Sequence, residues 1–282
     1  MDEWLSFLAR GGPFVLVPAA LAAGFWLFEW TKIYRPSRLL DTSPAAVQLD
    51  YEDVDFVAED GRPLAGWWIP HPRARGTMLH CPGQSGNMGD RLHLAVDYHQ
   101  LGMNVFLFDY RGYGRSRGIP TEKGTYRDAR AAFEVIRARY GDAEAPPVVV
   151  HGVSLGGAVA VQLALDKPVR GLILEGAFTS IRDMGARLYP WLPMRWLSRF
   201  RYDSLAKMPR LKTPLLLAHS REDERTPFEF GRRLYEAAAE PKRMVELTGR
   251  HRDAGWNRTP EYGRALQDFL DRVLGPLPRD NN

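Results

Sequence analysis

The chain has 282 residues, of which 45% are hydrophobic and 26% charged, a composition typical of a globular protein with room for a large α/β domain. Its 38 basic and 34 acidic residues leave a scattered net charge of +4, which suits an anionic surface such as phospholipid but gives no reason to expect a nucleic-acid partner. The single cysteine excludes an intramolecular disulfide, and no Cys or His spacing indicates a metal site.

The N-terminal segment is the first feature in chain order. Residues 11–28, GGPFVLVPAALAAGFWLF, carry no charge and reach the lower length limit of a helix that spans a bilayer. Tryptophans lie near both ends of the segment, and Lys32, Arg35 and Arg38 follow it. We therefore expect residues 1–38 to be a membrane anchor and linker, with the catalytic domain on the cytoplasmic side. A cleaved signal peptide and a helix of a soluble enzyme are the alternatives.

Residues 39–282 read as one domain in which strand and helix patterns alternate. The first two expected strands form a hairpin, and the later ones are short apolar runs of the kind that is buried in a parallel sheet. The expected strands are 47–58, 63–70, 76–83, 104–110, 146–152, 169–176, 213–220 and 242–249, and the expected helices 88–101, 121–140, 154–165, 227–239 and 260–274. This alternation predicts an α/β fold, with a mostly parallel sheet covered by helices on both faces.

Residues 177–208 interrupt the alternation. The segment is long for a simple connection and is rich in aromatic, proline and methionine residues between positions 189 and 200. We expect it to be a small cap that shapes an apolar binding pocket, because long insertions at strand ends often form lids. The alternative is a single surface helix with one buried stripe.

The stretch HGVSLGG, residues 151–157, joins an expected strand to an expected helix. It contains the pattern Gly-x-Ser-x-Gly, in which a sharp turn holds a serine above the edge of the sheet. Gly152 and Gly156 would allow the turn and its close packing. The pattern alone is common and also fits a plain structural turn. A nucleophilic Ser154 needs a base to take its proton and an acid to orient that base.

The partners of Ser154 should follow in the order acid, then histidine. Asp223 follows one expected strand and His251 follows the next, so each group would lie after a different strand. His219 as the base would leave the acid in the wrong order. We expect Asp223 to be the acid and His251 the base. Glu175, at the end of another strand, is the alternative acid.

An oxyanion hole needs two N–H donors. Leu155, directly after the nucleophile, supplies one, and the loop PGQSGN after the strand at 76–83 should supply the other. Gln84 is the best candidate in that loop for its backbone N–H. The alternative is a simple glycine-rich turn. Several other polar or reactive residues are expected to be structural, namely Cys81, His80, His151, Asp109, Arg111 and Ser116.

Together these stretches resemble the α/β-hydrolase superfamily, and most closely the membrane-anchored ABHD-type serine hydrolases. The resemblance covers roughly residue 50 to the C-terminus and rests on CPGQSGNMGDRL, VFLFDYRGYGRSRG, HGVSLGGAVA, GAFTSIRDM, HSREDERTP and GRHRD. It implies the triad Ser154, Asp223 and His251, with backbone donors at Gln84 and Leu155. Relatives usually have histidine before the oxyanion-loop glycine, where this chain has Pro82.

From these observations we expect a serine hydrolase that acts without a cofactor or a metal on an ester or thioester with an apolar, lipid-like acyl part. The N-terminal helix is expected to bring it to a membrane. One alternative is an aminopeptidase-like enzyme on the same fold, with Glu175 or Asp183 near the substrate amine. The other is an inactive, membrane-anchored binding protein.

Overall fold

The computed structural model describes residues 12–141, 147–251 and 259–277. Its centre is an eight-stranded sheet in the order β10-β9-β8-β7-β4-β6-β3-β2. Strands β2 and β3 form an antiparallel hairpin, β3 is antiparallel to β6, and the remaining neighbours are parallel. The strands are β2 (Glu52–Val57), β3 (Pro63–Ile69), β4 (Gly76–Cys81), β6 (Met103–Phe108), β7 (Val148–Val153), β8 (Gly171–Glu175), β9 (Leu215–Ser220) and β10 (Lys242–Leu247). The expected α/β architecture is confirmed.

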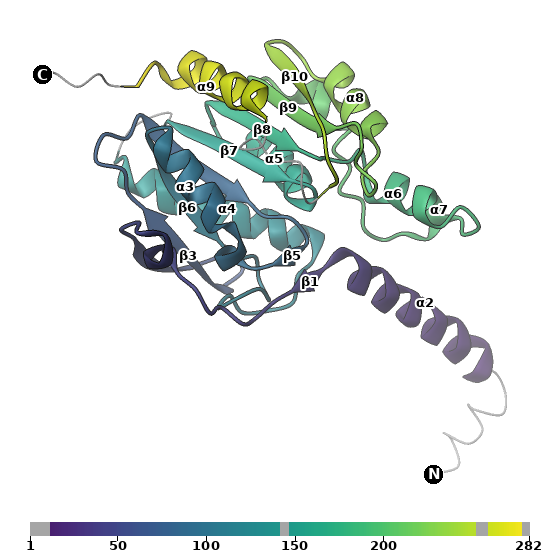
Figure 1. Ribbon diagram of the computed structural model, residues 1–282. Helices are drawn as coiled ribbons and strands as arrows, with labels where there is room; N and C mark the ends of the chain where they lie inside the picture. The colour runs from purple at the N-terminus through teal and green to yellow at the C-terminus, as the bar shows by residue number, and fades with distance from the viewer. Residues whose placement is uncertain (1–11, 142–146, 252–258, 278–282) are drawn as a thin grey trace, which may run out of the picture.

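Helices cover both faces of this sheet (Figure 1). Alternate residues of each buried strand point to opposite faces, so that Leu79 belongs to the hydrophobic core that includes α4, α5 and α8, whereas its neighbour Met78 belongs to the core that includes α3 and α9. The helices are α3 (Leu92–Gln100), α4 (Glu122–Arg139), α5 (Leu155–Asp166), α8 (Phe228–Ala237) and α9 (Pro260–Leu274). The sheet therefore has one hydrophobic core on each face. Because its central strands are parallel, their carboxyl ends lie at one edge of the sheet.

Helix α2 (Gly12–Ile33) projects from the domain and is the first described element of the chain (Figure 1). Its last turn is fixed to the domain, because the Trp30 indole donates to the carbonyl oxygen of Pro120 at 2.9 Å and Ile33 is buried. Within the described residues, no helix has both the length and the apolar character required to cross a bilayer. The expected transmembrane anchor therefore finds no support, and residues 1–11 lie outside the described part of the chain.

After α2 the chain runs through a short strand, β1 (Arg35–Pro36), which pairs with β5 (Ser85–Gly86) in the loop that follows β4. A 3₁₀ turn, η1 (Pro44–Val47), then ends at the residue where the first strand was expected to begin, and a second turn, η2 (Met88–Arg91), precedes α3. The pairing of β1 with β5 attaches the N-terminal segment to the sheet edge where the parallel strands end.

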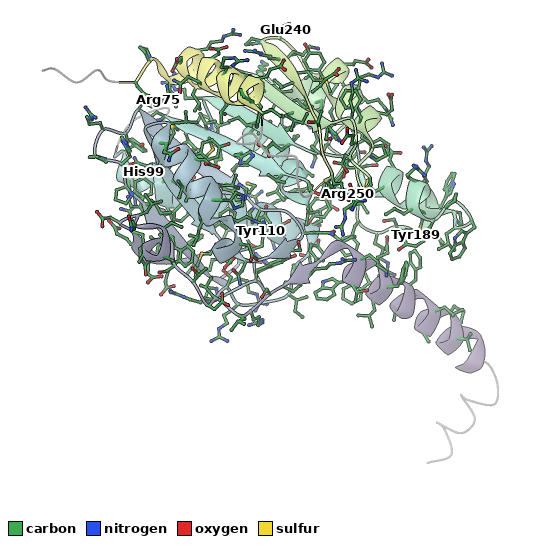
Figure 2. The ribbon with its side chains drawn as sticks, viewed as in Figure 1. Arg75, His99, Tyr110, Tyr189, Glu240 and Arg250 are labelled. Carbon is green, nitrogen blue, oxygen red and sulfur yellow. The ribbon has the colours of Figure 1, made fainter. Side chains whose placement is uncertain are left out.

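The segment 177–208 contains α6 (Ile181–Leu188) and α7 (Met194–Leu197), and is followed by the turn η3 (Met208–Arg210). We call α6, α7 and the loop between them the cap. The cap contacts α2, because the rings of Phe28 and Tyr189 meet edge to face with centroids 5.5 Å apart. Figure 2 shows Tyr189 on the side of the cap that faces α2. The cap and α2 thus form two walls beside the carboxyl ends of the strands.

Candidate active site

Ser154 occupies a strained turn between β7 and α5. Its φ of 53° and ψ of −115° form a backbone conformation that residues with a side chain rarely adopt. Its amide donates to the carbonyl oxygen of Glu175 at 2.9 Å, which ties the turn to the end of β8. A Cβ atom on Gly156 would lie 1.9 Å from the carbonyl oxygen of Cys81, and a Cβ atom on Gly152 would lie 2.6 Å from the carbonyl oxygen of Gly156. Both glycines are therefore required by close packing.

His251 and Asp223 form a short hydrogen bond beside this turn. Nδ1 of His251 lies 2.6 Å from Oδ2 of Asp223, and the other carboxylate oxygen, Oδ1, accepts the amides of Arg225 at 2.9 Å and Thr226 at 2.7 Å. Burial alone would raise the pKa of Asp223, but the His251 hydrogen bond and these amides outweigh it and hold the pKa below its ordinary value. Asp223 is thus an oriented carboxylate with the imidazole as its partner.

Gly176, directly after β8, lies where the three groups converge. A Cβ atom there would lie 3.3 Å from Cε1 of His251 and 3.5 Å from Oδ2 of Asp223. The amide of Ser154 donates to the carbonyl oxygen of Glu175, the residue before Gly176. Ser154 and His251 also line the same pocket. The structure therefore brings Ser154, Asp223 and His251 together at the carboxyl edge of the sheet.

Two other acid and base candidates hold different positions. The carboxylate of Glu175 accepts the hydroxyl of Tyr262 at 2.6 Å rather than pairing with His251. His219 is fully buried, and its Nε2 donates to the carbonyl oxygen of Thr226 at 2.8 Å. It thus supports the loop that carries Asp223.

The loop after β4 lies against the serine turn. A Cβ atom on Gly83 would lie 3.5 Å from the carbonyl oxygen of Val153 and 3.8 Å from Cβ of Ser154. The carbonyl oxygen of Gln84 accepts the amide of Arg35 at 2.8 Å and a tyrosine hydroxyl at 2.7 Å, so this peptide is held from outside the pocket. Among the described residues, the amides of Gln84 and Leu155 have no acceptor. Both are available to a ligand beside Ser154.

These groups line a cavity of about 680 Å³. On the side of the cap and α2 its lining is mainly apolar, formed by Phe28, Ile33, Phe178, Ile181, Met184, Leu188 and Met194. On the side of η2 and α3 it is mainly polar, formed by His80, Asp90, Arg91, His93 and Glu175. The cavity therefore offers two chemically different surfaces to the two parts of a substrate. Sequence reasoning missed the contribution of α2, because no local pattern shows which distant helix closes a pocket.

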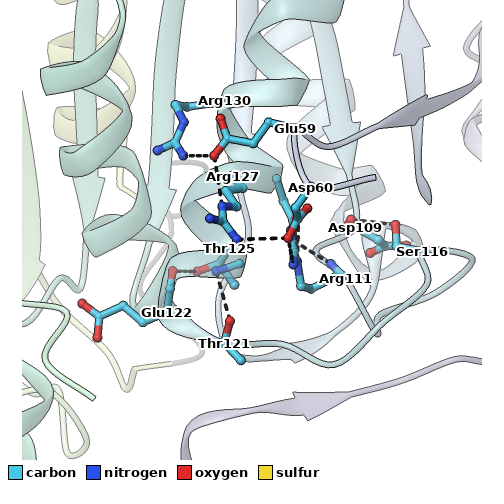
Figure 3. A network of polar contacts seen from close by, with 12 residues as sticks. Glu59, Asp60, Asp109, Arg111, Ser116, Thr121, Glu122, Thr125, Arg127 and Arg130 are labelled. Carbon is cyan, nitrogen blue, oxygen red and sulfur yellow. Dashed lines mark hydrogen bonds and ion pairs between the residues drawn. The ribbon is translucent and has the colours of Figure 1, made fainter. Parts of the chain in front are cut away.

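The glycine-rich loop after β6 is fixed by a buried polar network (Figure 3). Arg111 forms ion pairs with Asp60 and Asp128, both at 2.8 Å. Ser116 donates to the carbonyl oxygen of Asp109 at 2.7 Å. The side chain of Asp109 in turn accepts the amide of Met88 at 2.8 Å, in the turn that leads into α3. The structural roles expected for Asp109, Arg111 and Ser116 agree with these contacts.

Comparisons with known proteins agree with this architecture. The family model described as serine aminopeptidase, S33, matches residues 72–207. The chain is 38% identical to Rv2307c of Mycobacterium tuberculosis, an uncharacterized protein, over 94% of this chain and 95% of that protein. It is 32% identical to the alpha/beta hydrolase domain-containing protein WAV2 of Arabidopsis thaliana, over 94% of both. An esterase of Pyrococcus furiosus has the same fold, with a TM-score of 0.72 and 21% identity over 86% of this chain and 99% of the esterase. The chain therefore belongs to the α/β-hydrolase superfamily, as a hydrolase of the ABHD type.

Proposed function

We propose that the protein is a serine hydrolase that cleaves carboxylic esters or thioesters with an apolar acyl part. One observation carries the proposal: the 2.6 Å hydrogen bond between His251 and Asp223 stands beside Ser154, which is held in a strained strand-to-helix turn. A buried carboxylate that fixes the imidazole tautomer leaves the other ring nitrogen free to act as a base. The esterase fold of the Pyrococcus furiosus protein supports the same reaction class.

In the proposed mechanism, Oγ of Ser154 attacks the substrate carbonyl carbon while Nε2 of His251 takes the hydroxyl proton. Asp223 holds the imidazole and stabilises its cation. The amides of Gln84 and Leu155 stabilise the oxyanion, since both lie beside Ser154 without another acceptor. The imidazolium then protonates the leaving alcohol or thiol. Water, deprotonated by the same imidazole, attacks the acyl-enzyme, and the proton returns to Ser154 as the acid is released.

The apolar side of the cavity supports an apolar acyl group as the substrate. Ile181 and Met184 of the cap line it together with Phe178, and Phe28 of α2 completes it. Each buried methylene of an acyl chain contributes about 0.8 kcal/mol. Medium and longer acyl chains, including those of lipid-like esters, should therefore be cleaved at least as well as acetate.

A fluorophosphonate probe tests the nucleophile. Wild type should be labelled and Ser154→Ala should not, while p-nitrophenyl acetate, butyrate, octanoate and palmitate measure the acyl preference. A short acyl-thioester series run beside them separates esterase from thioesterase activity. Folded wild type that is neither labelled nor active would contradict the proposal and favour a binding protein on an inactive hydrolase fold.

The description of the matching family model as a serine aminopeptidase supports a second candidate, an enzyme that releases N-terminal residues. Such an enzyme needs an acidic group beside the substrate amine. Glu175 lines the cavity and its carbonyl oxygen accepts the amide of Ser154, although Tyr262 already donates to its carboxylate. Hydrolysis of aminoacyl p-nitroanilides, without hydrolysis of the acyl esters, would identify this activity instead.

A further inference from the structure

A chain of buried polar side chains runs beneath the polar side of the cavity. His80 and His151 are register partners on the neighbouring strands β4 and β7, and their Nδ1 atoms lie 3.2 Å apart. Nε2 of His151 lies 3.2 Å from Oε1 of Glu175, a close polar contact that lacks the geometry of a well-directed hydrogen bond. Oε1 of Glu175 also accepts the hydroxyl of Tyr262 at 2.6 Å. The proposed mechanism uses none of these four side chains.

The direction of the protons in this chain follows from electrostatics. Burial and the charge of Glu175 raise the pKa of Tyr262 well above its ordinary value, so its hydroxyl keeps its proton and donates. A neutral, fully buried His151 carries one ring proton, and because a lone pair on its Nε2 would be repelled by the carboxylate, Nε2 carries that proton and Nδ1 is the acceptor. His80 must then donate from its own Nδ1.

This tautomer leaves a lone pair on Nε2 of His80. His80 is only 2% exposed, and burial, together with His151, lowers its pKa well below the ordinary value, so the ring stays neutral. Among the described residues, no donor reaches its Nε2. The same side chain forms part of the cavity wall. A buried acceptor without a donor is costly, and a donor brought by a ligand would remove that cost.

The position of His80 indicates which part of the substrate brings the donor. Within β4, Met78 belongs to the core that includes α3 and α9, so the alternation of side chains places His80 on the same face, away from the cap. The apolar acyl chain is expected under the cap, on the other side of Ser154. The alcohol part of the ester is then the part that meets His80, together with Asp90 and His93 of the polar wall.

We propose that His80 determines specificity for the alcohol part of the substrate, by accepting a hydrogen bond from a hydroxyl or protonated amine carried on it. Glu175 and His151 are positioning residues that fix the tautomer of His80. This inference rests on the proposed ester hydrolysis and adds the chemical class of the alcohol. Hydroxylated and aminated alcohols share the required donor, and they can be separated by experiment.

Three octanoyl esters that differ only in the alcohol test the inference: propyl, hydroxypropyl and (dimethylamino)propyl, the last carrying one N–H at neutral pH. Wild type should prefer at least one donor-bearing ester over the propyl ester by about tenfold in kcat/KM, as expected for one satisfied buried acceptor. His80→Phe should reduce that ratio to about one, because the donor-bearing esters lose their acceptor whereas the propyl ester makes no hydrogen bond to it. His99→Phe, a change on α3 remote from the cavity lining, is the matched control and should keep the wild-type ratio.

A spectroscopic measurement on wild type makes the test independent of how well His80→Phe folds. The ¹⁵N resonance of Nε2 of His80 should be that of an unprotonated nitrogen. It should shift toward the hydrogen-bonded range when Ser154 is trapped with a hydroxypropyl phosphonate, and not with its propyl analogue. A protonated Nε2 in the free enzyme would overturn the inference.

The outcomes separate the two proposals. If wild type hydrolyses none of the esters, ester hydrolysis itself is wrong. If it hydrolyses all three equally well, ester hydrolysis stands and the role of His80 is refuted. A preference for one donor-bearing ester supports the inference and identifies the donor as a hydroxyl or an ammonium group.

Discussion

Replacing Asp223 by asparagine tests the orientation of the proposed base directly. The side chain of Asp223 is 1% exposed. Its Oδ2 lies 2.6 Å from Nδ1 of His251, and its Oδ1 accepts two backbone amides. Asparagine can keep both amide contacts through Oδ1, so the loop should stay folded. Its NH₂ group would face Nδ1 of His251 and demand a lone pair there, which moves the ring proton to Nε2.

An imidazole protonated at Nε2 cannot accept the proton of Ser154. We therefore expect Asp223→Asn to lower kcat on p-nitrophenyl octanoate by about ten-thousandfold, about 5.5 kcal/mol, with KM changed little. Fluorophosphonate labelling of Ser154 should slow in parallel. The assay is steady-state kinetics at pH 7 to 8, with thermal unfolding as a check that the variant is folded.

The neighbouring acid Glu224 provides the matched control. Its Oε2 accepts the backbone amide of His251 at 3.0 Å, and no contact to the imidazole ring is found among the described residues. Glu224→Gln should retain activity within about threefold of wild type, since an exposed hydrogen bond contributes about 1 kcal/mol or less. If Asp223→Asn keeps more than about a tenth of wild-type kcat, Asp223 does not set the imidazole tautomer, and its proposed role is refuted.

Three further predictions follow from packing and charge. Gly156→Ala should lower the free energy of unfolding by about 3 kcal/mol or more, because its Cβ would lie 1.9 Å from a backbone carbonyl oxygen of β4. Gly24→Ala is the control and should not destabilise the fold, since nothing lies within 4 Å of its Cβ. Urea unfolding compares the two variants. Burial raises the pKa of Asp109 to about 7, so the folded state holds a proton that the unfolded state releases above about pH 4, and stability falls as pH rises through this window. Asp109→Asn should therefore gain up to about 4 kcal/mol over wild type at pH 8 but little at pH 4, and an equal gain at both would refute the assignment. Phe28→Ala removes part of the cavity wall and should reduce kcat/KM for octanoate by about tenfold while sparing acetate, and a uniform loss on both esters would contradict an acyl-binding wall.

Local sequence patterns were sufficient to predict most strands of the sheet. The apolar runs of β4, β6 and β7 form central strands, and the helix expected at 260–274 matches α9. The first strand of the main sheet begins at Glu52 rather than at residue 47, because Val47 ends a 3₁₀ turn and Gln48 has a left-handed backbone with a φ of 58°, neither of which alternating polarity reveals. Hydrophobic period therefore predicts which elements exist better than it predicts where they begin.

Chain order was sufficient to predict that Ser154, Asp223 and His251 lie at one edge of the sheet, because parallel strands place their carboxyl ends together. The contact between His80 and His151 could not be derived in this way. It depends on the register of β4 against β7, which pairs these two positions. That register is set by the packing of both sheet faces and not by a local pattern. Likewise, Glu29 lines the cavity only because the end of α2 is fixed to the domain through Trp30.

Three departures from ordinary protein chemistry share one location. Ser154 carries positive φ without being glycine, His80 buries an acceptor without a donor, and Glu29 buries Oε1 without a partner among the described residues. All three side chains line the same cavity, although they come from three distant segments of the chain. Each costs free energy in the empty protein, and a sequence retains such costs where binding or chemistry compensates them. In the proposed mechanism, strain at Ser154 is compensated because the turn presents a nucleophile. By the same logic, we expect the unpaired atoms of His80 and Glu29 to be the places where a substrate, rather than the protein, completes the hydrogen bonding.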